Sequence, residues 1–216
     1  TRKNVQFMWK NNNYESFDHF LEFFSSRNRK NLKKERRKIA EQDLEIKRFT
    51  GNQISLDVVD DFYSFYVDTH LRRSGHSGYL NKDFFEEITQ TIADNILIIL
   101  AYKNGRAVAG SFFFYDQNNL YGRYWGASND YDALHFECCY YQGIDFCIEK
   151  NIKRFDPGVQ GEHKIKRGFE PTFTFSSHWI ENHDFSLAIS DFLLREDKYI
   201  KDYHQDASTL LPFKNI

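Results

Sequence analysis

The chain has 216 residues, of which 41% are hydrophobic and 18% aromatic, so it can bury a sizeable core. It contains only 3 Pro and 11 Gly, a composition that excludes fibrous, repetitive and largely disordered classes of protein. The formal net charge is −2, so the chain as a whole is not strongly basic, although its cations are unevenly distributed.

Hydropathy and cysteine usage narrow the class of protein further. The longest apolar run extends from Ile96 to Tyr102, about seven residues, and is too short to cross a bilayer. No series of charged, apolar and cleavage regions marks the start of the chain for secretion. The three cysteines lie close together, are odd in number and lack the spacing of metal ligands. We therefore expect reduced thiols, no metal site and a cytoplasmic location.

Positive charge is concentrated near the N-terminus, in the stretch RNRKNLKKERRK at residues 27–38. Residues 1–40 hold 11 Lys and Arg against 4 Asp and Glu, a net charge of +7, so the remaining residues carry −9. A basic run of this kind is usually a solvated helix face. Its functional alternative is a cradle for the phosphates of a nucleotide-like carrier or of RNA such as tRNA, with Arg29, Lys33 and Arg37 as contacts.

Hydrophobic periodicity predicts mostly helices in the first part of the chain. A helical region follows Ser16, and Asn81 precedes another helix; both side chains are typical of N-caps. The stretch LEIKRFTG alternates and ends in Gly, which predicts a short strand. The predicted elements are a helical region at 17–42, a strand at 44–51, and helices at 55–73 and 81–95.

The pattern changes at Ile96, where apolar runs separated by KNG and DQNN indicate three antiparallel strands. A helix, a buried strand, a loop, a further strand and a final helix follow. Strands on both sides of a central helix indicate a mixed α/β sheet with crossovers. The predicted elements are strands at 96–102, 106–115 and 119–125, a helix at 131–150, strands at 152–158 and 172–180, and a helix at 183–206.

No linker of the usual length or composition separates two domains. We expect residues 1–216 to form a single domain, in which a helical N-terminal segment at 16–95 packs on a sheet core at 96–180. The helix at 183–206 closes this domain. The opening TRKNVQFMWKNN has no initiator Met and enters in mid-pattern, so we expect the natural protein to have a preceding portion.

The predicted helix at 131–150 carries an acid on its apolar face, Glu137. A carboxylate in that position must be paired, hydrogen-bonded or protonated. A buried acid with a shifted pKa can act as a general base, and the structural alternative is an anchor that ties the helix to a buried Arg or Tyr. Arg123 is the nearest upstream cation that could pair with it. His135, Cys139 and Gln142 share the opposite side of the helix.

The stretch PGVQGEHKIKRGFEP, residues 157–171, is the strongest candidate for a functional site. It sets a His and two acids among three cations, and it follows a predicted strand. Strand ends in α/β sheets are where ligands bind, so we expect a functional loop rather than a solvated connection. The prediction is that residues 160–169 line the main cleft and face the start of the helix at 131–150.

Four stretches, LYGRYWGAS, LHFECCYYQGID, RFDPGVQGEHKIKRGFEP and TFSSHWI, together resemble a bacterial family of FemAB-like proteins. Members of that family are described as peptidoglycan biosynthesis or recognition proteins, or as acyltransferases. The stretches SSRNRKNLKKERR, FTG and GYLNKDFF fit it too, so the resemblance covers nearly the whole chain, which looks like the C-terminal part of a longer member. It implies the GNAT (acyl-CoA N-acyltransferase) fold, in which the strand at 152–156 splays from its neighbour and opens the acyl-donor cleft.

The resemblance implies acyl-CoA or aminoacyl-tRNA as donor substrate, with no permanently bound cofactor. Acetyl-CoA enzymes of this fold usually carry an Arg/Gln-x-x-Gly-x-Gly/Ala loop for pyrophosphate, where this sequence has GASNDYD. FemAB-type enzymes also diverge there and use aminoacyl-tRNA. They place a Lys beside the substrate in a segment like Phe-Lys-x-Gly-Phe. The stretch IKRGF implies Lys166 for that role, with Ile165 in place of the aromatic residue.

The expected function is transfer of an acyl or aminoacyl group to an amine acceptor, related to peptidoglycan. Main-chain N–H groups of the splayed strands and a cation, Lys166 or Lys164, would stabilise the oxyanion. Glu137, Glu162 or His163 would be the general base. Substrate contacts are expected from Arg123, Tyr124, His135, Gln142, Gln160, Lys164 and Arg167.

These assignments predict a distance within the fold. At least one of Glu162, His163 and Lys166 should lie within about 10 Å of Glu137 or His135, a gap that a bound substrate group and waters could bridge. The alternative function is a non-catalytic GNAT-like module that recognises a peptidoglycan-type peptide or RNA. Variants of Glu137 and Lys166 that bind a ligand but lose turnover would favour the enzyme.

Overall fold

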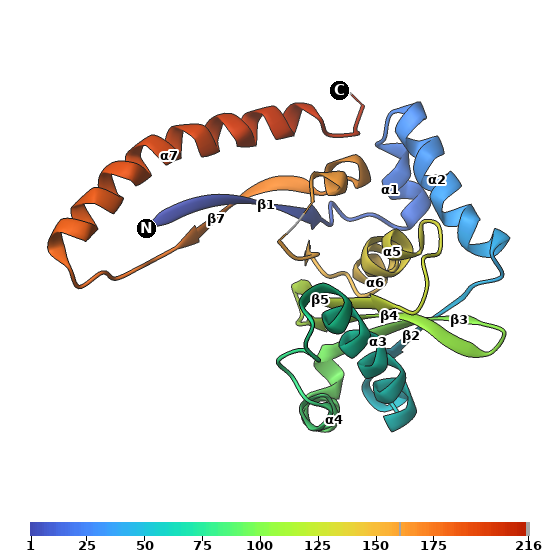
Figure 1. Ribbon diagram of the computed structural model, residues 1–216. Coiled ribbons are helices and arrows are strands. Elements are labelled where there is room, and N and C mark those ends of the chain that lie inside the picture. The colour runs from blue at the N-terminus through green and yellow to red at the C-terminus, as the bar shows by residue number, and fades with distance from the viewer. Residues whose placement is uncertain (160, 215–216) are drawn as a thin grey trace.

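The computed structural model describes residues 1–159 and 161–214. Within this part of the chain, seven strands form one sheet in the order β2-β3-β4-β5-β6-β1-β7 (Figure 1). All neighbouring strands are antiparallel except β5 and β6, and this mixed sheet confirms the predicted GNAT-like α/β class. The strands are β1 (Arg2–Lys10), β2 (Glu45–Thr50), β3 (Ile96–Lys103), β4 (Arg106–Tyr115), β5 (Asn119–Ala127), β6 (Arg154–Asp156) and β7 (Glu170–Ser176).

The central strands β3, β4 and β5 form where apolar runs alternate with short turns. The β3–β4 turn places Asn104 and Gly105 at positive φ, the conformation that a two-residue hairpin turn requires. β3 pairs with β4, and β4 pairs with β5, in sequence order and antiparallel. The predicted strands at 96–102, 106–115 and 119–125 are therefore confirmed.

Strand β1 was not predicted, since residues 1–15 were given no element. It lies between β6 and β7, and it pairs with β7 from Arg2 to Met8. Phe7 and Trp9 are buried on one face of β1, as the period of a strand requires. The strand predicted at 44–51 is confirmed as β2, which interrupts the helical segment at 16–95 and joins the sheet beside β3.

The helices of the described chain differ widely in length, and the last one, of 27 residues, is the longest. The predicted helical region at 17–42 is two helices, because the chain turns between Glu22 and Ser26. Ser16 and Asn81 act as N-caps, as predicted, and accept hydrogen bonds from main-chain N–H groups. The helices are α1 (Phe17–Glu22), α2 (Ser26–Glu41), α3 (Leu56–Ser74), α4 (Lys82–Thr91), α5 (Leu134–Phe136), α6 (Gln142–Glu149) and α7 (His183–Thr209).

Helices cover both faces of the sheet (Figure 1). α3 and α4 pack on one face, where Phe62, Phe85 and Phe112 are fully buried. α5 and α6 lie on the other face, together with α1 and α2, over a larger core that includes Phe113 and Phe155. Each layer buries the apolar side of its helices against the strands, and β5 therefore has helices on both of its sides.

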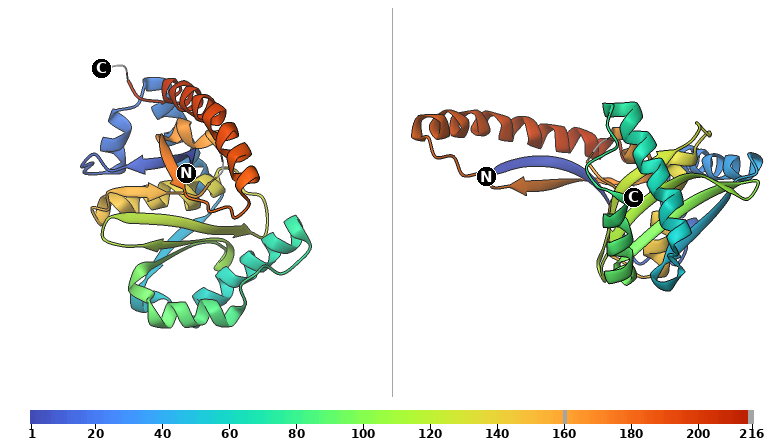
Figure 2. Two further views of the ribbon diagram at one scale, coloured as in Figure 1. Left: turned by 90° about the vertical axis from the view of Figure 1, so that its left-hand side faces the viewer. Right: turned by 60° about the horizontal axis from the view of Figure 1, so that its bottom comes forward.

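Strands β1 and β7 extend away from the rest of the sheet, and α7 runs alongside them (Figure 2). Arg2 and Lys3 of β1 form ion pairs with Glu196 and Asp197 of α7. The long helix α7 agrees with the helix predicted at 183–206. In the part of the chain that the structure describes, no helix is long and apolar enough to cross a membrane.

Candidate active site

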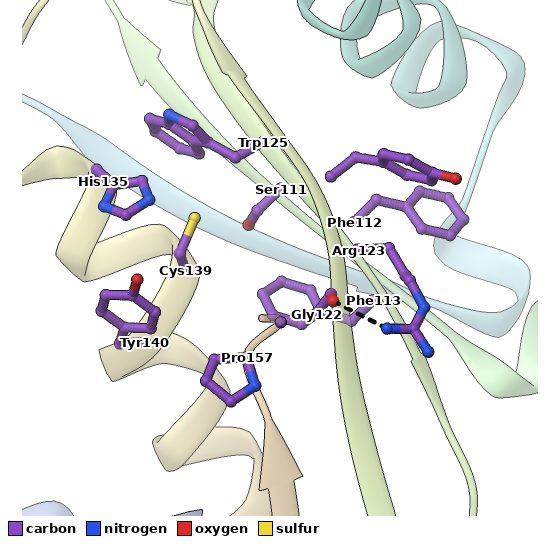
Figure 3. Close-up of a pocket in the computed structure, with 12 residues that line it drawn as sticks. Ser111, Phe112, Phe113, Gly122, Arg123, Trp125, His135, Cys139, Tyr140 and Pro157 are labelled. Carbon is purple, nitrogen blue, oxygen red and sulfur yellow. Dashed lines mark hydrogen bonds between the residues drawn. The ribbon is translucent and has the colours of Figure 1, made fainter. Parts of the chain in front are cut away.

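The candidate site lies where β5 and β6 separate. β6 pairs with β5 only between Asn119 and Tyr121, whereas β4 continues to pair with β5 as far as Ala127. Beyond Tyr121, no strand within the described residues pairs with the second edge of β5. A small cavity of about 120 Å³ lies at this opening, between strands β4 and β5 and the helical segment that begins with α5 (Figure 3). It is lined by Ser111, Phe112, Phe113, Gly122, Arg123, Tyr124, Trp125, His135, Cys139, Tyr140, Pro157 and Gly158.

The base of the opening depends on close contact between β5 and the turn that follows β6. A Cβ atom at Gly122 would lie only 3.3 Å from the Cα atom of Pro157. Asp156 fixes the same turn, because its Oδ1 accepts a hydrogen bond of 2.9 Å from the N–H of Gly158. The strands therefore stay together at Gly122 and part above it.

Arg123 is the extra residue of a β-bulge. Gly122 pairs with Phe113 and the next paired residue, Tyr124, pairs with Phe112, so Arg123 has no partner on β4. Its exposed side chain lies across β5 from His135, Cys139 and Tyr140 (Figure 3). The bulge thus separates a cation on one side of the strand from helix residues on the other.

The helix wall of the cavity contains a wide, π-helical turn at Glu137–Tyr141, between α5 and α6. The helix predicted at 131–150 is therefore present from Leu134 to Glu149. Its number of residues per turn increases at Glu137–Tyr141, between two α-helical parts. The His135 ring packs edge-on against Trp125, with centroids 5.4 Å apart. Burial and nearby cations lower the pKa of His135 to about 4, so its imidazole is neutral near pH 7.

Lys164 brings a buried cation to the opening. It belongs to the 3₁₀ turn η4 (Glu162–Arg167), and its Nζ donates a hydrogen bond of 2.6 Å to the carbonyl oxygen of Gly158, which lines the cavity. Burial lowers the pKa of Lys164 to about 8, although Asp156 favours the charged form. Lys164 does not itself line the cavity, and its ammonium group is linked to the wall through the carbonyl of Gly158. Its pKa of about 8 means that it loses its proton just above neutral pH.

His163 lies beside Lys164 and contacts the helix wall. Its Nε2 is hydrogen-bonded to the hydroxyl of Tyr140 at 2.8 Å, and its ring centroid lies 6.3 Å from that of His135. The predicted closeness of His163 to His135 is therefore confirmed. The predicted lining of the cleft by this loop is not, because none of residues 161–169 lines the cavity. Burial lowers the pKa of His163, and the charges of Arg167 and Lys164 lower it further. Tyr140 had no predicted role, since its helical spacing suggested only a core residue.

Arg167 positions the loop. Its guanidinium stacks on the ring of Phe136, 3.4 Å from the centroid, and donates hydrogen bonds of 2.8 and 2.9 Å to Glu35 of α2. It also donates to the hydroxyl of Tyr141 and to the carbonyl of His163. With its guanidinium engaged in this way, Arg167 anchors η4 to two helices, and the cavity wall does not include it.

Glu137 is 3% exposed, so the predicted burial is confirmed. Its partner is Arg36 of α2, at 3.0 Å, and not Arg123 as predicted. Gln142 donates a second hydrogen bond of 2.7 Å to the same carboxylate, and Arg36 also pairs with Asp145 at 2.8 Å. Burial raises the pKa of Glu137 more than Arg36 lowers it. The carboxylate therefore links α2 to α6 through Arg36 and Gln142. Neither Glu137 nor Gln142 lines the cavity.

Other predicted site residues are also placed away from the cavity. Glu162 is exposed and accepts a hydrogen bond of 2.8 Å from Tyr203 of α7. The side chain of Lys166 is exposed on η4 and does not line the cavity. Gln160 lies outside the described residues.

The predicted phosphate contacts lie on α2. Lys33 pairs with Asp18 at 2.7 Å, and Arg37 pairs with Glu41 at 2.9 Å, whereas Arg29 is half-buried. The C-terminal end of α2 approaches the loop before α5, where Lys38 pairs with Asp132. The basic helix therefore borders the helix wall of the site, on the side away from the sheet.

The comparisons with known proteins agree with this architecture. The model of the FemAB-like family, described as peptidoglycan biosynthesis/recognition, matches residues 1–215. The chain therefore belongs to the FemAB-like family. Among curated proteins, no significant match is found.

Two solved structures share the fold. A crystal structure of FemX aligns with a TM-score of 0.54 and 12% sequence identity, over 85% of this chain and 56% of FemX. The structure of L-PGS from Bacillus licheniformis aligns with a TM-score of 0.53 and 12% identity, over 80% of this chain and 59% of L-PGS. The aligned region thus spans little more than half of either protein, and the similarity concerns the fold.

Proposed function

We propose that this chain transfers an acyl or aminoacyl group from an ester or thioester donor to an amine acceptor of the peptidoglycan type. The FemAB-like family supports the reaction class, and the fold shared with FemX agrees with it. The observation that carries the proposal is Lys164, a buried ammonium group whose Nζ meets the cavity wall at Gly158, where β5 and β6 part.

The opening has the chemical groups that acyl transfer needs. The nitrogen of the acceptor attacks the carbonyl carbon, a C–N bond forms, and the C–O or C–S bond to the leaving group breaks. Beyond Tyr121, the free edge of β5 presents main-chain N–H groups to the developing oxyanion. Lys164 adds a positive charge in a partly dehydrated setting, where it stabilises that oxyanion more than it would in water.

His163 is the best-placed general base. Its lowered pKa keeps the imidazole neutral near pH 7, and Tyr140 connects it to the cavity. The acceptor can pass its proton through the Tyr140 hydroxyl to His163, and the leaving group then takes up a proton. Glu137 is assigned an anchoring role instead, because Arg36 and Gln142 hold its carboxylate outside the cavity wall.

The loop before α5 favours aminoacyl-tRNA over acyl-CoA as the donor. In acetyl-CoA enzymes of this fold, the start of this helix holds a pyrophosphate. Here the loop carries the exposed Asp130, whose charge opposes a pyrophosphate at the helix start, while the nearby Asp132 is paired with Lys38.

A transfer assay with matched lysine variants tests this function. The protein is incubated with mixed aminoacyl-tRNAs, or with acetyl-CoA, and with peptidoglycan stem peptides, and the new amide is detected by mass spectrometry. Lys164→Met should lower turnover by about a hundredfold or more, whereas the exposed neighbour Lys166→Met should change it less than about threefold. Peptide binding without product from any donor would instead identify a recognition module.

A further inference from the structure

A second, larger cavity of about 400 Å³ lies across β5 from the helix wall, against the C-terminal half of α3. It shares Arg123, Tyr124 and Trp125 with the cavity at the β5–β6 opening. Its volume is in the usual range for a small-molecule site, whereas the smaller cavity holds little more than a reacting group. The two cavities therefore border the bulge of β5 from its two sides.

The shape of this cavity follows from the way α3 crosses β5. A Cβ atom at Gly126 would overlap the carbonyl oxygen of Phe65, so helix and strand are in backbone contact there. Arg72 fixes the crossing by donating a hydrogen bond to the carbonyl of Ala127. From that closed end, the cavity widens along one face of α3 toward the bulge. The α3 residues that line it are Tyr66, Thr69, His70, Arg73 and Ser74.

The cavity carries positive charge that no acidic side chain of its lining balances. Arg73 and Arg123 both line it, and neither forms an ion pair within residues 1–159 and 161–214. No Asp or Glu of the described chain lines it. Arginine presents a planar fork of donors that matches phosphate and carboxylate groups. The two arginines therefore favour an anionic ligand in this cavity.

The remaining wall is aromatic and held in place. The rings of Tyr66 and His70 have centroids 4.5 Å apart, and those of Tyr66 and Tyr124 are 5.1 Å apart. The hydroxyl of Tyr66 accepts hydrogen bonds from the N–H groups of Tyr79 and Leu80, which pins the segment after α3 beside the cavity. A fixed set of rings favours a flat or cyclic portion of a ligand.

We propose that this cavity binds the acceptor substrate through an anionic group, a phosphate or a carboxylate, attached to a ring. Arg73 and Arg123 bind the anion, and Tyr66 and His70 contact the ring. The acceptor amine then reaches past the bulge of β5 to the opening beside Lys164. The assignment to the acceptor rests on the proposed transfer function, whereas the binding site itself does not.

Binding of small probes tests the site without any turnover. Phenyl phosphate and phenylacetate each join an oxyanion to a ring, benzyl alcohol has the ring alone, and inorganic phosphate has the anion alone. Dissociation constants are measured by NMR titration with the whole chain. At least one of the two anions should bind about tenfold or more tightly than benzyl alcohol and than inorganic phosphate. The tighter of the two identifies the anion.

Arginine variants locate the bound anion. Arg73→Ala and Arg123→Ala should each weaken binding of the tighter probe by about tenfold or more. Both side chains are exposed, so these variants should fold normally, and Arg106→Ala, an exposed arginine outside both cavities, should not weaken binding. Absence of binding by both anions, or wild-type affinity in either variant, overturns the proposal. Because no transfer is measured, these outcomes are independent of the Lys164 assay.

Discussion

Lys164 gives the site a measurable electrostatic signature. Its ordinary pKa of 10.5 falls to about 8 in the folded protein, chiefly because burial disfavours the ammonium form. Between these values the unfolded chain binds a proton that the folded chain releases, so this group makes stability rise with pH. Below pH 8 both states carry the proton, so the buried charge lowers the free energy of unfolding by its full amount.

A stability comparison checks this signature. From about pH 7 to about pH 9.5, the wild-type protein should gain up to about 2 kcal/mol of unfolding free energy relative to Lys164→Met. Urea denaturation of both proteins at each pH gives the difference, in which other titrating groups cancel. A constant difference over this range would show that Lys164 is not buried as an ammonium group.

The pair of His163 and Tyr140 should carry the proton transfer. His163→Asn should lower turnover by about a hundredfold or more, because a positioned base contributes at least that much. Tyr140→Phe should also lower turnover, since it removes the hydroxyl that connects His163 to the cavity. His178→Asn, at an exposed histidine of the β7–α7 connection, is the control, and equal rates in all three variants would exclude this base.

Among the secondary-structure elements, α2 and the helix wall depend on a partly buried ion pair. Arg36→Met should destabilise the protein by about 3 kcal/mol, because it leaves Glu137 and Asp145 without their cation. Arg37→Met, which breaks only an exposed pair with Glu41, should cost less than about 1 kcal/mol. Chemical denaturation of the two variants separates these values. Similar small losses would mean that Glu137 does not anchor the helices.

Local signals made most elements predictable, and distant pairing was what the sequence concealed. The KNG turn and the apolar runs around it specify β3 and β4 without help from the rest of the chain. β1 is different, since its partners on β6 and β7 lie more than a hundred residues away in the sequence. Its nine residues alone did not distinguish a strand from an irregular terminus.

The candidate site was predicted in position but only partly in detail. Charge and strand order led to the loop at 157–171, of which Pro157 and Gly158 line the cavity, whereas residues 161–169 do not. The π-helical turn at Glu137–Tyr141 was not predictable from a 3.6-residue period. The burial of Glu137 was predicted correctly, but burial alone left its role open between a general base and an anchor. In the same way, the spacing within HKIK did not show that the η4 turn buries Lys164 and exposes Lys166.

Over the whole molecule, charge separates the N-terminal part from the rest. The basic helix α2 carries Arg29, Lys33 and Arg37, and the exposed pairs of the last two are weak enough for a phosphate to displace. We predict that tRNA binding falls steeply with salt, and that replacing all three by Glu weakens it at least about tenfold. Filter binding at several salt concentrations measures this. Reversal of Lys150, Lys153 and Lys198, which are exposed elsewhere, is the control, and an equal loss there would leave α2 as a solvated face.

The central claim is that a protonated Lys164 at the β5–β6 opening stabilises the oxyanion of acyl transfer. The most direct test is the pH dependence of kcat/KM for the wild-type protein and for Lys164→Arg. The wild-type rate should fall as the pH rises through about 8, where Lys164 loses its proton. In Lys164→Arg this decline should disappear, because a guanidinium keeps its charge over that range. The same decline in both proteins would contradict the claim.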